Sequence, residues 1–223
     1  MKKLCFGFHN LEVFLMKKNK TLIVTTLLCL LPMIFSAAVY TRLPEQMAIH
    51  WGPNNEPNGY APRLIGAFGL PLLMAVLNIV VHVGLDHDPR NNNSAPAIKL
   101  LGKWCIPVLS LIMVPASLLI NMGHELPIDK IAMIMVGIIF TICGNYLPKC
   151  RQNYTIGIKI PWTLASEENW NKTHHLAGYL WIIGGILMIF FGLFGFPILT
   201  VLLLIPLAVV PMIFSFVLYK KGD

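Results

Sequence analysis

The sequence contains few charged residues. Asp, Glu, Lys and Arg together make up 12% of its 223 residues, whereas a soluble globular domain carries about 25%. Hydrophobic residues account for 56%, which exceeds the roughly 45–50% of soluble domains. This composition excludes an ordinary soluble domain and is typical of an integral membrane protein.

Charge is missing from six long runs, and a helix needs about 20 such residues to cross a bilayer. The runs are Thr21–Tyr40, Leu64–Leu85, Trp104–Asn121, Ile131–Asn145, Leu176–Gly195 and Pro197–Tyr219. The fourth run is short unless it extends to Ile128 and Leu147. Because the backbone must satisfy its own hydrogen bonds in lipid, the runs predict an all-α membrane protein with six transmembrane helices.

The hydrophobic centres of these runs contain no Asp, Glu, Lys or Arg. Such residues are costly inside a bilayer and mark proton relays or ion paths. Their absence argues against a transporter that is coupled to protons or ions. His82 comes nearest, three residues before the end of its run, and we expect it at the membrane interface.

Motifs of common enzymes and metal sites are also missing. The sequence has no P-loop, no dinucleotide-binding fingerprint and no Cys/His spacing for a structural metal. We therefore expect no enzymatic activity, no cofactor and no metal. Of the five cysteines, three lie in the runs and two on the side assigned below to the cytoplasm, so no extracytoplasmic disulfide is expected.

The distribution of Lys and Arg predicts the orientation. Fourteen of the 17 basic residues fall on the side of the two termini, and the other three are Arg42, Arg63 and Lys130. The positive-inside rule therefore places both termini in the cytoplasm, N-in and C-in. The basic residues are spread over four segments and form no single patch, so direct nucleic-acid binding is not expected.

Residues 1–20 form a cytoplasmic N-terminal extension on this interpretation. Met16 precedes two lysines and is itself a suitable start, in which case residues 1–15 are a start-site artefact. The first run, followed by Ser36 and two alanines, also resembles a cleavable signal peptide. It continues to the length of a full span, which favours a retained helix.

Three glycines, Gly178, Gly185 and Gly192, recur every seven residues in the fifth run. They lie on nearly one face of a helix and allow another backbone to approach closely. We expect the sixth run to be that neighbour, because only Phe196 and its two flanking residues separate the two runs.

The first loop outside the membrane, residues 42–63, is rich in Pro, Gly and Asn, which predict a series of turns that form a folded cap. Its aromatic residues are expected either in an aromatic belt at the membrane surface or in contact with a ligand. Glu45 and one histidine are metal-ligand types, but no second histidine lies near them. The candidate recognition residues are His50, Trp51, Pro57, Gly59 and Tyr60.

The cytoplasmic loop, residues 146–175, begins with an alternating pattern. Apolar side chains alternate from Tyr154 to Ile160, which predicts an extended segment with one apolar face, ended by Pro161. We expect the aromatic residues of the loop near the level of the lipid headgroups; these are Tyr146, Trp162 and Trp170.

The second half of this loop predicts a helix start. Ser166 precedes two glutamates, which suits a capped helix that continues into the fifth run. Ser166 and His174 would stand about two turns apart on that helix, too far for a hydrolytic pair. The candidate residues of the cytoplasmic motif are Asn145, Tyr146, Pro148, Lys149, Asn153, Tyr154, Gly157, Pro161, Trp162, Thr163, Ser166, Trp170, Lys172, Thr173 and His174.

The two loops resemble a known family at specific motifs. In the cytoplasmic loop these are GNYLPK, NYTIGIKIPWTL, SEENW and KTH, and the sequence is similar there to the SdpI family of bacterial membrane proteins. In the outer part they are LPEQMAIHW, EPNGY and DPR, which resemble a domain of unknown function often fused in front of it. The sequence departs from the family pattern at four positions, which are Gln152, Ile160, His175 and Ala177.

The resemblance implies a six-span protein of the bacterial cell membrane that gives resistance to a secreted, membrane-active peptide toxin. It also implies two units, a two-span unit over residues 21–95 and a four-span unit over residues 96–223. A further implied role is a sensor that captures a cytoplasmic ArsR-type transcriptional repressor. The four departures from the family pattern change the cytoplasmic face that would bind this repressor, which implies a changed or absent partner.

Two alternatives remain beside this hypothesis. One is a small transporter or lipid-handling membrane protein, in which basic residues of the cytoplasmic loop contact anionic lipid. These residues are Lys149, Arg151, Lys159 and Lys172. The other is a scaffold whose loops only close the bundle.

Overall fold

The computed structural model describes residues 20–52, 55–90 and 96–222. In these ranges, six helices are long and apolar enough to cross a membrane, which confirms the predicted all-α membrane protein. The predicted N-terminal extension, apart from residue 20, lies outside the described residues. The helices that follow the first helical segment, residues 20–30, are α2 (Pro32–Val39), α3 (Arg63–His87), α4 (Pro96–Asn121), α5 (Ile128–Tyr146), α6 (Pro161–Ala165), α7 (Glu167–Phe194) and α8 (Pro197–Lys221).

The first and fourth spans are assembled from more than one helical piece. A turn at Leu31 separates the first segment from α2, and a 3₁₀ turn (Tyr40–Arg42) completes that span. In the fourth span, α5 begins at Ile128 and is followed by a 3₁₀ turn, η3 (Leu147–Lys149). The expected extension of the short fourth run to Ile128 and Leu147 is therefore confirmed.

The loop 42–63 folds as an antiparallel hairpin of β1 (Gln46–Trp51) and β2 (Pro57–Pro62). The expectation of a folded cap is confirmed, but the expected series of turns is wrong, because the two strands pair along their length. Met47 anchors the hairpin. Its side chain is fully buried in an apolar cluster with residues of α2, α3 and α4, and it packs directly over Gly66 of α3.

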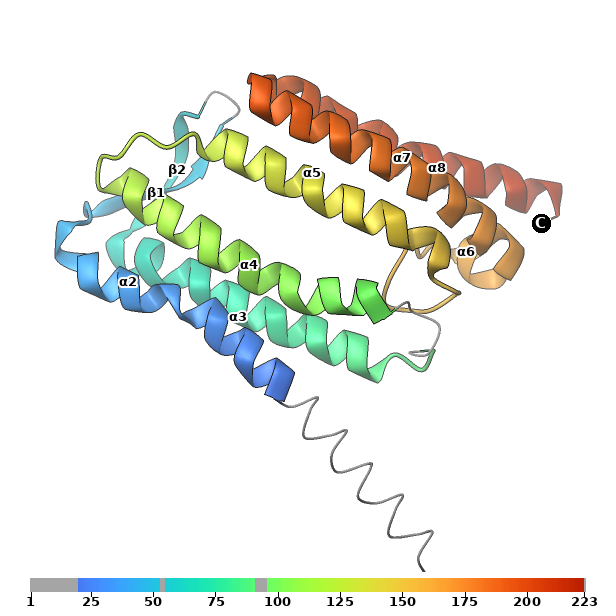
Figure 1. The fold of residues 1–223 in the computed structure, drawn as a ribbon, viewed down its shortest axis with the longest axis horizontal. Helices are drawn as coiled ribbons and strands as arrows, with labels where there is room; N and C mark the ends of the chain where they lie inside the picture. Colours follow the sequence, from blue (N-terminus) through green and yellow to red (C-terminus); the bar gives the residue numbers. More distant parts are fainter. Residues whose placement is uncertain (1–19, 53–54, 91–95, 223) are drawn as a thin grey trace, which may run out of the picture.

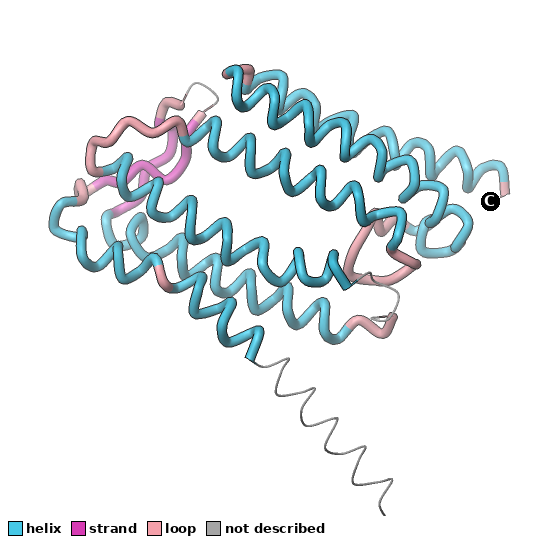
Figure 2. The backbone as a smooth tube through the Cα atoms, in the orientation of Figure 1, coloured by secondary structure: helices cyan, strands magenta, loops and turns pink. Residues whose placement is uncertain are grey.

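The spans form two groups of three, with the hairpin at one end and the 147–166 segment at the other (Figures 1 and 2). The first helical segment with α2, α3 and α4 makes one group, and α5, α7 and α8 make the other. Between the groups, α4 and α5 touch over only a small area. The two units inferred from sequence resemblance, residues 21–95 and 96–223, remain a prediction. In the packing, α4, the first helix of the second unit, lies against α3 of the first.

The glycine face of α7 packs on α5, so the expectation that it meets the sixth span is wrong. A Cβ on Gly185 would lie 2.5 Å from the Gly137 carbonyl oxygen, and a Cβ on Gly178 would lie 2.8 Å from the Gly144 carbonyl oxygen. Two glycines of α5 thus face two glycines of α7. The backbones approach so closely because no side chain stands between them.

The last span packs on a different face of α7. Leu207 of α8 sits over Gly184, whose added Cβ would lie 2.6 Å from a Leu207 methyl. The Trp181 indole N–H donates to the Leu207 carbonyl at 3.0 Å. Gly195, in the left-handed conformation with φ 76°, ends α7 and allows the chain to reverse. The short connection makes α7 and α8 neighbours, as expected. Their contact is at Gly184, however, which is next to Gly185 but is not part of the seven-residue repeat.

Candidate functional site

The segment between α5 and α7 folds over the start of α7 as a unit that we call the loop cap (residues 150–166 with Trp170 and His174). Trp170 is fully buried at its centre. Its indole N–H donates to the Cys150 carbonyl at 2.8 Å, and its ring stacks on His174 with the centroids 3.9 Å apart. Protein therefore encloses Trp170 on all sides and keeps it from contact with lipid, while its expected position at the level of the headgroups remains a prediction.

His174 is 1% exposed and uses both ring nitrogens. Nδ1 lies 2.7 Å from the Trp170 carbonyl oxygen, and the backbone N–H of Ile158 donates to Nε2 at 3.0 Å. Since Nε2 accepts a hydrogen bond, the proton of the neutral ring is on Nδ1. His174 therefore ties the cap to α7.

Gly157 makes the close approach to His174 possible. Its φ is +118°, a region that L side chains rarely adopt, and a Cβ there would lie 2.4 Å from His174 Nε2. The chain bends at this glycine, and residues 154–160 form no strand. The predicted extended segment with one apolar face is therefore wrong, since the motif is built for a bend around His174.

Asn153 and Thr163 satisfy the backbone of the bend. The Asn153 side-chain oxygen accepts from the N–H groups of Thr155 and Ile156 at 3.0 and 2.7 Å. The Thr163 hydroxyl donates to a carbonyl inside the cap and accepts from the backbone N–H at position 160 at 3.1 Å. Pro161, expected to end the extended segment, instead begins α6 at its first position. Both polar side chains are fully buried, which fits a structural role.

The start of α7 follows the prediction. The Ser166 hydroxyl accepts from the Asn169 N–H at 3.2 Å, and the helix runs without interruption into the fifth span. Lys172 forms an ion pair with Glu168 at 2.8 Å, and the Thr173 hydroxyl donates to the Asn169 side chain at 3.2 Å. Ser166 is thus engaged as a helix cap.

The segment after α3 clamps the loop cap from the other helix group. The Asp88 carboxylate accepts from the Thr155 hydroxyl at 2.6 Å and from the backbone N–H groups of Tyr154 and Arg90 at 3.0 and 2.8 Å. Burial opposes ionisation of Asp88, but these hydrogen bonds outweigh it and hold the pKa of the carboxyl below its ordinary value. The Arg90 guanidinium reaches the Gln152 side chain and lies 5.0 Å from the centre of the Tyr154 ring.

Asp88, Arg90 and Gln152 were missing from the predicted site. Gln152, one of the departures from the family pattern, is 5% exposed and donates to the carbonyls of Thr163 and Leu164 at 2.9 and 2.8 Å. It thus connects α6 to Arg90. The DPR motif was the sequence signal for this clamp, but only the fold brings positions 88 and 90 next to position 152.

The remaining predicted residues of the cytoplasmic motif lie around the edge of the loop cap. Trp162 packs against Phe216 and Tyr219 of α8. Lys149 lies over the Tyr146 ring at 4.8 Å. Pro148 packs on α7, and Asn145 is exposed.

The predicted recognition residues gather on the hairpin. His50 is exposed and hydrogen-bonded to Asn58, while Gly59 lies beneath it, since an added Cβ would stand 3.0 Å from the His50 Cβ. Tyr60 is 59% exposed. Trp51 pairs with Pro57 where the strands end, and it is partly buried.

Two asparagines that sequence reasoning missed fix the hairpin to both helix groups. Asn121, the last residue of α4, accepts from the Ala48 N–H at 2.7 Å and donates to the Ala48 carbonyl at 2.9 Å. Asn55, in the left-handed conformation with φ 61°, donates to the Leu126 carbonyl and accepts from the Ile128 N–H, both at 3.1 Å. Nothing in their spacing marks them, because each partner lies about 70 residues away.

An apolar cavity of about 470 Å³ lies between the two helix groups next to the loop cap. Residues of α3, α4 and α5 line it, including Cys105 and Cys143, and Thr155 and Ile156 of the cap close one side. A second apolar pocket of about 250 Å³ continues along α4 and α5. The groups are therefore joined firmly at both ends and loosely between them.

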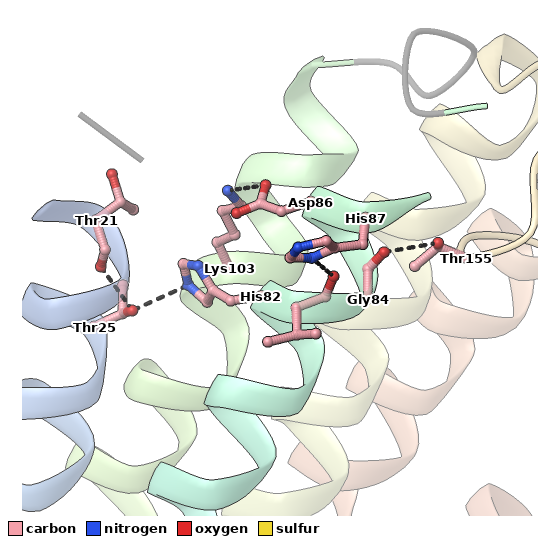
Figure 3. Close-up of polar contacts among 9 residues, drawn as sticks. Thr21, Thr25, His82, Gly84, Asp86, His87, Lys103 and Thr155 are labelled. Atoms are coloured by element: carbon pink, nitrogen blue, oxygen red, sulfur yellow. Dashed lines mark hydrogen bonds and ion pairs between the residues drawn. The ribbon is translucent and has the colours of Figure 1, made fainter. Parts of the chain in front are cut away.

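His82 is buried inside the protein, where its ring is 1% exposed, and its expected position at the level of the membrane interface remains a prediction. Its Nε2 lies 3.1 Å from the Thr25 hydroxyl, which also accepts from the Asn78 amide at 3.0 Å. Figure 3 shows this contact beside the ion pair of Lys103 in α4 with Asp86 in α3, at 2.8 Å. These contacts hold the first span to α3 and α3 to α4.

No three His, Cys, Asp or Glu side chains come together as a potential metal site within residues 20–52, 55–90 and 96–222. His50, the histidine of the hairpin, is hydrogen-bonded to the neutral side-chain amide of Asn58.

The six spans, with the hairpin at one end and the loop cap at the other, define a helical, multi-pass membrane protein. Comparison with known proteins gives the family. The sequence model of the SdpI/YfhL protein family matches residues 149–217, and a domain of unknown function, DUF1648, matches residues 27–75. The immunity protein SdpI of Bacillus subtilis (strain 168) is 30% identical over 210 residues, which cover 92% of this chain and 98% of that protein. No solved structure matches significantly.

The chain therefore belongs to the SdpI/YfhL protein family. The DUF1648 match contains the whole hairpin, and the SdpI/YfhL match contains the whole loop cap.

Proposed function

We propose that the chain is a membrane immunity protein that gives resistance to a secreted, membrane-active peptide toxin. The observation that carries this proposal is the similarity to an immunity protein along nearly the full length of both chains. The similarity covers 92% of this chain and 98% of that protein, so the proposal does not rest on a single motif.

The proposal orients the hairpin end outward and both termini toward the cytoplasm. Its basis is the excess of Lys and Arg on the side of the loop cap. A toxin that arrives from outside would then meet the hairpin first. The exposed Tyr60 and Ile49, 59% and 49% exposed, offer apolar contact for an amphipathic peptide.

A non-enzymatic action fits the geometry of the loop cap. Ser166 caps α7, and both nitrogens of His174 are engaged. The residue types that a hydrolytic site would use are therefore bound in structural roles.

The finer part of the proposal is a sensor role, in which the loop cap captures an ArsR-type repressor. The support is the exposed surface of the loop cap. Tyr154 and Lys159 are exposed there, while the backbone beneath them is held by hydrogen bonds. Replacing Lys159 with Glu should abolish toxin-dependent recovery of the repressor with membranes and leave toxin resistance intact. Equal recovery with and without toxin would contradict the sensor role.

The cavity between the helix groups favours one second candidate, a small transporter or lipid-handling protein. About 470 Å³ of apolar space next to the loop cap is large enough to hold part of a lipid chain. Transport or lipid transfer by the purified protein in vesicles, lost when Gly102 is replaced with Leu to fill this space, would favour that candidate over immunity.

Immunity is tested in B. subtilis cells that lack their own SdpI protein and are challenged with the peptide toxin against which that protein gives immunity. Expression of this chain should restore growth. Tyr60→Ala should reduce protection, whereas Tyr179→Ala, which removes a similarly exposed tyrosine from α7, should not. Protein amounts in the membrane are measured for each variant. Continued killing by the toxin at normal amounts of wild-type protein would refute the proposal.

A further inference from the structure

A cavity with cationic walls lies at the edge of the loop cap, between residues 148–151 and the first turns of α7. Its volume is about 370 Å³. The residues that line it are Pro148, Lys149, Cys150, Arg151, Asn171 and His175. A neighbouring depression of about 220 Å³ shares Arg151 and Asn171 and includes Glu167.

The fold holds this cavity in place through two fixed contacts. Pro148 packs on Gly178 of α7, where an added Cβ would lie 2.6 Å from the proline ring. The Cys150 carbonyl accepts the indole N–H of Trp170 at 2.8 Å. Lys149 and Arg151 therefore project from a backbone that is tied down on both sides, so the cavity is formed before any ligand arrives.

The charges around the cavity favour an anion. Lys149 lies over the Tyr146 ring at 4.8 Å, and the Arg151 guanidinium has no carboxylate partner among the described residues. Glu167 borders the adjacent depression but forms no ion pair with Arg151. Lys172, on the same helix but outside the lining, is paired with Glu168. A guanidinium that is not neutralised matches a phosphate group, which accepts two parallel hydrogen bonds from it.

An apolar stripe on α7 begins directly below the cavity. His175, Tyr179, Ile183 and Ile186 follow at spacings of four, four and three residues, which places them on one helix face. The last three are 64%, 58% and 55% exposed. The cavity lies where the fourth span ends, at Lys149, and close to the start of the fifth at Glu167. A cationic cavity at the end of the spans thus stands above a surface that faces lipid tails.

We propose that this cavity binds the phosphate group of an anionic phospholipid, with one acyl chain along the stripe from Tyr179 to Ile186. The phosphate chemistry alone would also suit free phosphate. The lipid is favoured because the stripe supplies contact for an acyl chain, which inorganic phosphate lacks. This site is independent of toxin recognition by the hairpin.

The test uses the full-length protein in detergent, titrated with phosphatidylglycerol or with phosphatidylcholine, and native mass spectrometry to count bound lipid. The wild type should retain phosphatidylglycerol in preference to phosphatidylcholine. Lys149→Gln and Arg151→Gln should each weaken phosphatidylglycerol binding about fivefold, the effect of one cation near an anionic headgroup, and the double variant roughly 25-fold.

Two single changes serve as controls. Lys172→Gln removes a cation outside the cavity and should leave binding unchanged, whereas Glu167→Gln removes the neighbouring carboxylate and should strengthen it. Thermal melting of each variant verifies the fold. An equal loss with Lys172→Gln, or equal retention of the two lipids by the wild type, would overturn the proposal. Displacement of phosphatidylglycerol by millimolar inorganic phosphate would overturn the assignment to a lipid.

Discussion

Gly185→Ala should force α5 and α7 apart. The new methyl would lie 2.4 Å from the Thr141 hydroxyl, 2.5 Å from the Gly137 carbonyl oxygen and 2.6 Å from the Thr141 nitrogen. Carbon contacts are optimal at about 3.5–4.0 Å, so the helices must separate by about 1 Å. Since two of the three atoms belong to the backbone, no side-chain rotation relieves the overlap.

The cost follows from the type of obstacle. Overpacking that side chains absorb costs about 1–3 kcal/mol, and a gap of about 1 Å forfeits up to half of each dispersion contact along an interface. We therefore expect a loss of about 3 kcal/mol or more, against a gain of about 1 kcal/mol from replacing glycine in a helix. The net loss of about 2 kcal/mol corresponds to a melting temperature lower by about 4–8 °C for a chain of this length.

The assay is thermal unfolding of the purified protein, followed by tryptophan fluorescence. Gly69→Ala is the matched control, because its new methyl meets only one Ile65 methyl, at 3.3 Å. It should melt at or slightly above the wild-type temperature. If Gly185→Ala melts as high as Gly69→Ala, then close backbone contact does not hold α5 to α7 and the reasoning is refuted.

Three further predictions concern the caps. Gly157→Ala should lower the melting temperature more than Gly123→Ala, because both have positive φ but only the first methyl meets another residue, His174 Nε2 at 2.4 Å. Asp88→Asn should destabilise the protein by about 1–3 kcal/mol at neutral pH. Because the pKa of Asp88 is lowered in the folded protein, the stability difference between wild type and variant should be complete above the ordinary pKa of 3.8 and should vanish as the pH falls through the folded pKa. Melting curves measured across this pH range check it. Asn121→Ala should speed hydrogen exchange in the hairpin strand that it binds while α5 stays protected, and unchanged exchange would contradict the anchoring role.

The spans and the start of α7 were predictable because their signals are local. An uncharged run long enough to cross a bilayer has one low-energy form in lipid, and the Ser166 cap needs only a neighbour three residues away. The repeat of Gly178, Gly185 and Gly192 also correctly indicated a close helix contact. It did not identify the partner, because spacing along one helix says nothing about which helix packs against it; Gly137 and Gly144 of α5, also seven residues apart, are the glycines that meet this face.

The candidate site was predictable as a set of residues and less so as an arrangement. Asn153, Gly157, Thr163, Trp170 and His174 do come together, yet as a hydrogen-bonded bend where alternation had predicted an extended segment. The alternation of apolar residues is a period-two signal, and a glycine with positive φ overrides it. The segment instead folds around the ring of His174, which accepts the backbone N–H of Ile158 and lies against Gly157.

The sequence by itself determined that this chain crosses a membrane six times and where its polar caps lie, because hydrophobicity and length act on each segment alone. Only the tertiary structure decided that α7 packs on α5, that Asp88 and Arg90 clamp the loop cap, and that Asn121 and Asn55 anchor the hairpin. These contacts join residues that are tens of positions apart. Their energies depend on the geometry of both partners at once, which no local pattern records.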